Sequence, residues 1–288
     1  MPALIDLRRR IRSVRNTQQV TKAMKTVATA KFKKAQRRVL EARPWWHETP
    51  VQVRALVALA GRERHPLLER RPEKRVHVVV VTGDKGLCGA FNSNLLAEVQ
   101  AFLEAKAESA DIRLTLIGRK AVNYFRKKTF PVEAAYGERI DRFGDAEIGA
   151  IARDLVRRFV YHGADAVYVA YNEFKSILGP QIAVVPLLPI PLPPEAEGAA
   201  PPPAPAVEPG PGPMLRALLP AFVEDQLRHC FYESQAAEQA ARMMAMDLAT
   251  KNAEELVDTL HLQLNKIRQA SITKELLEIM TAVDALAK

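Results

Sequence analysis

The chain has 288 residues, of which 48% are hydrophobic and 26% charged, and this composition suits one or two folded domains. Its longest apolar runs are far shorter than the ~20 residues that cross a bilayer, and its first residues lack the apolar core of a secretory signal. We therefore expect no membrane span and residence inside the cell. The two cysteines, Cys88 and Cys230, lie far apart and are expected to be free thiols.

The net charge of +9 is concentrated near the N-terminus. Residues 1–43 hold 13 Lys or Arg against Asp6 and Glu41, which gives +11, whereas residues 214–288 hold 8 basic and 11 acidic residues, which gives −3. A basic helix of this kind is compatible with nucleic acid, a membrane surface or an acidic protein cavity. Composition does not choose among these partners.

The first 60 residues predict a helix much longer than those of ordinary globular domains. A mostly apolar register follows the heptad spacing of a coiled coil. Its positions are Leu4, Leu7, Ile11, Val14, Gln18, Thr21, Lys25, Ala28, Phe32, Ala35 and Val39. The register turns polar between Gln18 and Lys25. A second stripe lies on another face there, formed by Val20, Met24 and Val27. We therefore expect this part of the helix to contact more than one surface.

Two prolines fall in the second half of this helix. Pro44 and Pro50 each remove a helical hydrogen bond and clash with the preceding turn. The helix is therefore expected to bend or break near Trp45, and Gly61 and Pro66 mark its expected end.

Strand and helix patterns alternate in the centre of the chain, with Asp145 as a plausible N-cap. Strands are predicted at Arg75–Thr82, Ile112–Gly118, Val132–Tyr136, Asp165–Tyr171 and Gln181–Leu188, and helices at Ser93–Ala107, Arg119–Lys127 and Asp145–His162. This alternation favours a small α/β sheet of mostly parallel strands, resembling a Rossmann domain.

Residues 189–213 contain 11 of the 20 prolines and are predicted to be a linker, extended or disordered. A second long helix follows, with apolar residues mostly at steps of three and four, at Leu256, Leu260, Leu264, Ile267, Ile272, Leu276, Ile279, Val283 and Leu286. An antiparallel coiled coil of the two terminal helices is the economical way to bury both apolar stripes. The predicted segments are thus 1–60 (helix), 74–188 (α/β domain), 189–213 (loop) and 214–288 (helix).

The sequence contains no recognisable catalytic, cofactor or metal signature. The turn at residues 82–92 lies where a nucleotide-binding fold places its phosphate loop, but Gly83, Gly86 and Gly89 fit no phosphate-binding pattern. We interpret them as glycines for positive φ and close packing. The six histidines show no metal-ligand spacing. We therefore expect no catalytic residue, no cofactor and no metal.

Three passages together resemble the gamma subunits of bacterial F-type ATP synthases. They are residues 11–31 (IRSVRNTQQVTKAMKTVATAK), residues 86–92 (GLCGAFN), and residues 241–252 (ARMMAMDLATKN) continuing into 264–279 (LNKIRQASITKELLEI). They cover both ends and the middle of the chain in the family's order. The family normally has Gly-Ala after this last passage, where the chain has Ala282 and Val283. That difference affects the expected local packing only.

The resemblance implies a central rotor shaft that performs no catalysis itself. The coiled coil is expected to stand inside a ring of three alpha and three beta subunits, and the α/β domain to lie beside the epsilon subunit and above the membrane c ring. Ion flow turns the shaft, which forces each beta subunit through open and closed states. The chain is expected at the cytoplasmic face of a bacterial membrane, attached indirectly through the c ring. The cysteine pair of chloroplast relatives is absent, so thiol regulation of that type is not expected.

The resemblance also implies residues that contact the alpha/beta ring. Met24 and Arg242 match positions that face an acidic loop of a beta subunit, and a second set engages the ring higher up: Arg268, Gln269, Thr273 and Glu275. For Met24 the alternative is packing within the coiled coil. The main rival function is a nucleic-acid-binding coiled coil that uses the basic first helix. A nucleotide-dependent enzyme that uses the turn at Gly83 is a second rival.

Overall fold

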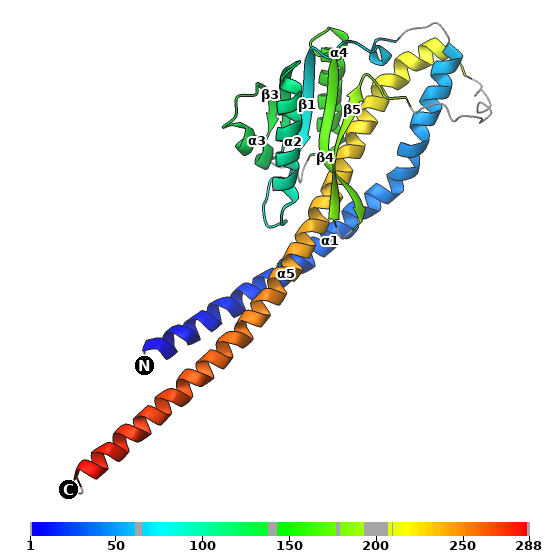
Figure 1. Ribbon diagram of the computed structural model, residues 1–288. Helices are drawn as coiled ribbons and strands as arrows, with labels where there is room; N and C mark the ends of the chain where they lie inside the picture. The colour runs from blue at the N-terminus through cyan, green and yellow to red at the C-terminus, as the bar shows by residue number, and fades with distance from the viewer. Residues whose placement is uncertain are drawn as a thin grey trace, which may run out of the picture. The chain divides into compact units, whose positions relative to one another are not determined.

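The structure is a computed structural model that describes residues 2–60, 65–137, 143–176, 179–192, 207–208 and 210–286. The chain divides into two compact units. One consists of residues 1–29 and 242–288, and the other of residues 30–241. Two long helices, α1 (Pro2–Ala60) and α5 (Pro211–Leu286), contribute to both units (Figure 1). Most of the predicted linker, 193–206 and 209, lies outside the described residues.

The larger unit contains a five-stranded sheet in the order β3-β2-β1-β4-β5. The strands are β1 (Arg75–Val81), β2 (Asp111–Ile117), β3 (Val132–Tyr136), β4 (Ala166–Ser176) and β5 (Gly179–Leu188). All neighbouring strands are parallel except β4 and β5, which are antiparallel. The expected fold class, a mostly parallel Rossmann-like sheet with two long terminal helices, is confirmed.

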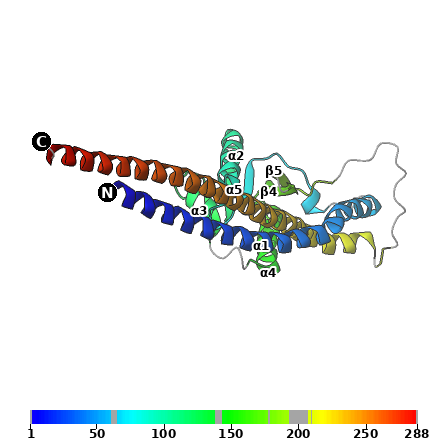
Figure 2. The same ribbon diagram turned by 90° about the horizontal axis from the view of Figure 1, so that it is seen from below.

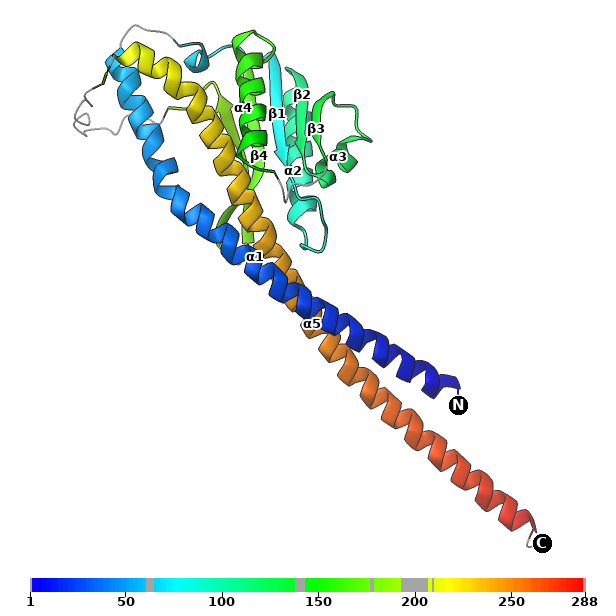
Figure 3. The same cartoon turned by 180° about the vertical axis from the view of Figure 1, so that it is seen from behind.

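Helices cover both faces of the sheet, as Figure 3 shows from behind. On one face lie α2 (Phe91–Ala107) and α3 (Arg119–Phe125), which pack on the inward side chains of β1 and β2. On the other face lie α4 (Asp145–Val160) and the first part of α5. A 3₁₀ helix, η1 (Pro66–Leu68), joins this second layer.

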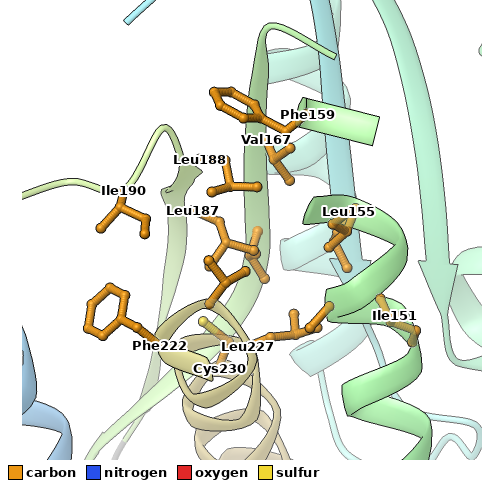
Figure 4. Packing of buried hydrophobic residues seen from close by; sticks show 14 of the residues in the cluster. Ile151, Leu155, Phe159, Val167, Leu187, Leu188, Ile190, Phe222, Leu227 and Cys230 are labelled. Carbon is orange, nitrogen blue, oxygen red and sulfur yellow. The ribbon is translucent and has the colours of Figure 1, made fainter. Parts of the chain in front are cut away.

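The core of the second layer joins residues that are far apart in the chain. Figure 4 shows Ile151, Leu155 and Phe159 of α4 facing the sheet, with Leu227 and Cys230 of α5 beside them (Figure 4). All five are at most 3% exposed. Burying such side chains contributes about 1.5–3 kcal/mol each. The first part of α5 is therefore part of the α/β core.

The helix boundaries differ from prediction in two places. α1 continues through Pro44 and Pro50 to Ala60, and its second half curves (Figure 1). Of the two outcomes expected near Trp45, a bend or a break, the break does not occur. Asp145 is the first residue of α4 and does not cap it. The N-cap is Gly144, whose N–H donates to the Glu147 carboxylate at 2.9 Å.

The predicted heptad register of α1 is the buried one. Its members Ile11, Thr21, Ala28, Phe32 and Val39 are all at most 9% exposed. The other positions of that register are half-buried, and the intervening positions are mostly exposed. The spacing alone thus identified the inward face of α1.

The predicted stripe of α5 is only partly buried. Leu260 is buried and Leu264 is half-buried, but Leu256 is exposed. The buried residues near Leu256 in the sequence are Ala253 and Val257. The inward face of α5 thus uses smaller side chains than the leucine pattern indicates.

Candidate functional site

The smaller unit is an antiparallel helix pair whose register is set by polar contacts. Thr250 Oγ1 lies 2.9 Å from Thr21 Oγ1, and Lys25 Nζ lies 2.5 Å from Asp247 Oδ1. Lys25 and then Lys251 hydrogen-bond the Asp247 carboxylate and hold its pKa below the usual range. These contacts occur where the heptad register of α1 turns polar, and they fix which residues of the two helices lie level.

The second stripe of α1 faces away from this seam. Val20 and Val27 are 58% and 57% exposed, and Met24 between them is half-buried. Contact of this part of α1 with a second surface stays a prediction.

The C-terminal part of α5 has no apolar cover among the described residues. Figure 2 shows α5 extending past the N-terminal end of α1 (Figure 2). The exposed large side chains of this segment are Leu262, Ile267, Ile272, Leu276, Leu277, Ile279, Met280 and Val283. Exposed apolar side chains in this number on one helical segment are typical of a binding surface for another molecule.

The predicted contact residues all lie in the smaller unit. Arg268, Gln269, Thr273 and Glu275 are exposed on consecutive turns of α5, where the Thr273 hydroxyl donates to the Gln269 carbonyl at 3.0 Å. The structure thus brings these four together beside the uncovered apolar side chains. Arg242 differs from them, since it is only 9% exposed. Leu262, Leu277 and Met280 belong to the same surface but lie outside the predicted stripe.

The turn after β1 is held by hydrogen bonds of its own. The Gly83 N–H donates to Asn92 Oδ1 at 2.9 Å, and the Asn92 amide donates to Cys88 Sγ at 3.2 Å. Cys88 is 2% exposed, and both cysteines are free thiols as expected. Leu87 and Gly89 adopt positive φ, so one of the three glycines meets the conformational expectation.

The residues that the structure describes were compared with the requirements of a metal site and of a membrane-spanning helix. Within these ranges, no group of three or more His, Cys, Asp or Glu side chains is arranged to hold a metal ion. Nor does any described helix combine the length and apolarity of a membrane span.

These features define a class of protein. Long paired helices carry an uncovered apolar end, and an α/β domain is built onto them, so the chain is suited to making contacts within a larger assembly. The exposed surface of the helices is its candidate functional site.

Comparison with known proteins identifies the assembly. Residues 3–286 match the ATP synthase family. The ATP synthase gamma chain of Solibacter usitatus is 44% identical over 99% of both chains, and that of Anaeromyxobacter dehalogenans is 42% identical over 99% of this chain and 100% of the relative. The chain therefore belongs to the gamma-chain family of ATP synthases. It is a non-catalytic, central-stalk subunit of a membrane-associated rotary complex, and nothing in these matches supports nucleic-acid binding.

Solved structures agree on the fold. A chain in the central stalk and c-ring structure of the Tetrahymena thermophila mitochondrial ATP synthase has a TM-score of 0.60 at 21% identity, covering 80% of this chain and 99% of that chain. A chain in the rotor structure of the Euglena gracilis enzyme has a TM-score of 0.65 at 17% identity, covering 94% and 99%.

Proposed function

We propose that the helix pair is the part of the shaft that a ring of alpha and beta subunits surrounds, and that it couples ion flow through the c ring to conformational cycling of the beta subunits. The observation that carries this proposal is the uncovered apolar end of α5. Apolar side chains held in water are costly, so a partner that encloses them is stabilised by their burial. A ring interior around the helix provides such an enclosure.

The contact residues proposed for the ring are Met24, Arg242, Arg268, Gln269, Thr273 and Glu275. The +11 charge of residues 1–43 favours acidic partner loops by electrostatic complementarity. The exposed stripe of Val20 and Val27 beside Met24 supports contact with the ring in addition to packing within the pair. Arg242 also lies on α5, but its low exposure supports a smaller contact area with the ring than that of Arg268, Gln269, Thr273 and Glu275.

The α/β domain is proposed to bind the epsilon subunit and the c ring, which attaches the chain indirectly to the cytoplasmic face of the membrane. The chain's segments in this proposal are the helix 1–60, the α/β domain 74–188, the loop 189–213 and the helix 214–288. Neither nucleic acid nor a cofactor is part of the proposal.

Coexpression with alpha and beta subunits of the same organism tests the function. Native mass spectrometry should show a stable assembly that contains one copy of this chain. Recovery of the alpha and beta subunits without it would contradict the proposal, and so would tight, salt-sensitive DNA binding by the chain.

The contact residues are tested by single substitutions in that assembly. Gln269→Leu and Arg268→Leu should weaken assembly or lower the coupling of ATP hydrolysis to pumping, because each removes a polar contact at the ring. Gln263→Leu is the matched control, since Gln263 is also exposed on α5 but is not among the proposed contacts. Wild-type behaviour of both Gln269→Leu and Arg268→Leu would remove these residues from the site.

A further inference from the structure

Helix α5 carries a carboxylate to the carboxyl edge of the parallel sheet. At this edge α/β proteins of this topology usually bind their ligands. Glu238 of α5 is 7% exposed, and its carboxylate lies directly over Gly83, the second residue after β1. A Cβ atom on Gly83 would lie only 2.6 Å from Glu238 Oε1. A side chain of α5 therefore lies at the edge where proteins of this topology usually bind ligands.

The turn beneath the carboxylate is held on both sides. The Gly83 N–H donates to Asn92 Oδ1 at 2.9 Å, and the Gly83 carbonyl accepts from the Lys120 N–H at 3.2 Å. Before it in the chain, Thr82 Oγ1 accepts from the Ala121 N–H at 2.9 Å. Because both peptide groups of Gly83 are engaged, an added Cβ would displace the Glu238 carboxylate more readily than the turn.

A second carboxylate of α5 reaches the same edge. Glu233 is 1% exposed, and its Oε2 accepts from the Phe174 N–H at 3.0 Å. Arg43 of α1 donates to Glu233 Oε1 at 3.1 Å and to the Phe174 carbonyl at 2.6 Å. Phe174 lies in β4 beyond the last residue that pairs with β1, Ala170. Side chains of both helices thus take the place of a neighbouring strand.

Burial draws the pKa of Glu233 upward, but its interactions with the neighbouring His229 and Arg43 side chains outweigh it and hold that pKa below its usual value. The carboxylate is therefore ionised in the folded chain. Small residues line the same stretch of α5, with Ser234, Ala236, Ala237 and Ala240 all buried.

We propose that Glu238 is a positioning residue that fixes α5 against the carboxyl edge of the sheet, so that torque on the α/β domain passes into the helix at this point. This inference rests on the proposed rotary function. It also gives Gly83 a specific reason to be glycine, which is to leave room for the carboxylate. In addition, the carboxylate closes the edge that a nucleotide would need.

A double-mutant cycle on the full-length chain tests the contact. Gly83→Ala should lower the melting temperature, because its Cβ expels a buried carboxylate. In a Glu238→Ala background the same change should have no further effect, since the Cβ then enters vacated space. Such non-additivity is expected only for groups in contact. Gly86→Ala is the matched control, because a Cβ there would meet no atom closer than Lys120 Nζ at 3.7 Å.

Additive effects in the cycle, or no effect of Gly83→Ala in the wild-type background, would overturn the contact. The isolated chain suffices for this measurement, so the outcome does not depend on whether the ring assembles.

Torque transfer is tested in the reconstituted complex, where ATP hydrolysis and ATP-driven ion pumping are measured together. Glu238→Ala and Gly83→Ala should retain hydrolysis while the number of ions pumped per ATP falls several-fold. Glu238→Gln, which keeps the shape and removes the charge, should fall between wild type and Glu238→Ala. Glu255→Ala, at an exposed position of α5, should leave the ratio unchanged.

An unchanged pumping ratio with a lowered melting temperature would reduce Glu238 to a purely structural role and overturn the proposal. Failure of the wild-type chain to join the complex would instead refute the proposed function. The two failures are therefore distinguishable.

Discussion

His77 is a buried titratable side chain that makes the stability of the α/β domain depend on pH. It is 2% exposed in β1, with Nε2 2.8 Å from Thr115 Oγ1. Burial, assisted by the charge of Arg158, lowers its pKa from 6.5 to about 4. The unfolded chain therefore takes up this proton near pH 6.5 and the folded chain only near pH 4. The stabilisation is complete above pH 6.5 and declines by roughly 3 kcal/mol as the pH falls to about 4.

Urea unfolding of the full-length chain at a series of pH values measures this decline. Carboxylates titrate in the lower part of the same window, so the comparison with His77→Gln isolates the imidazole. The variant should show a distinctly shallower loss of unfolding free energy between about pH 6.5 and pH 5. Equal slopes for the variant and the wild type would contradict the prediction.

The ion pair of Glu233 and Arg43 shows what sequence reasoning misses at the level of residues. The two lie 190 positions apart, and Phe174, which they share, is 131 positions from Arg43. No local spacing relates such residues, whereas Arg268 and Gln269 could be proposed as contact residues because they belong to a contiguous passage that resembles the family. A glutamate within an alanine-rich stretch of α5 was the only available signal.

Replacing Glu233 tests how much its ion pair with Arg43 stabilises the fold. Glu233→Ala should lower the unfolding free energy by roughly 1–3 kcal/mol, because the buried Phe174 N–H loses its acceptor and Arg43 keeps only the Phe174 carbonyl. Glu278→Ala, which removes an exposed partner of Lys274, should have little effect. Urea unfolding compares the two. A similar small loss for both would show that the pair contributes no more than a surface contact.

At the scale of elements, the heptad spacing located the inward face of α1, whereas the proline rule on its own left open a break that does not occur. Local propensity disfavours proline inside a helix, yet α1 runs through Pro44 and Pro50 because Trp46, Val53 and Leu56 are all buried along this segment. Tertiary packing therefore outweighs the local cost. The leucine pattern of α5 predicted the buried face incorrectly in part, because several of its leucines lie on faces that this chain alone does not bury.

The close packing of the two helices at Ala28 gives a prediction about side-chain size at this position. Ala28 is 1% exposed, so Ala28→Leu should force the helices apart at this level and destabilise the chain by roughly 1–3 kcal/mol. Val27→Leu, one position along and 57% exposed, is the control and should be nearly neutral. Thermal unfolding of both variants distinguishes them. Equal stability would show that the seam has free space at Ala28.

On the scale of the whole molecule, the chain separates the residues that stabilise its own fold from those that are available to a partner. The α/β core and the first part of α5 are buried together, whereas beyond Lys274 every side chain described on α5 is exposed. Family resemblance predicted the role of this end, and the uncovered surface gives a physical reason for it. In the proposed function its partner is a different chain, so the fold of this chain alone would not contain the complete binding site.

Deleting residues 275–288 tests this separation. Because the described side chains of that segment are exposed, their loss removes little buried area, and the melting temperature of the isolated chain should change by no more than about 2 °C. The same deletion should weaken the complex with alpha and beta subunits, since it removes Leu276, Leu277 and Met280 from the proposed interface. Calorimetry on the isolated chain and native mass spectrometry on the complex give the two readings. A large drop in melting temperature, or an undiminished complex, would show that the end of α5 serves the fold of the chain and not its partner.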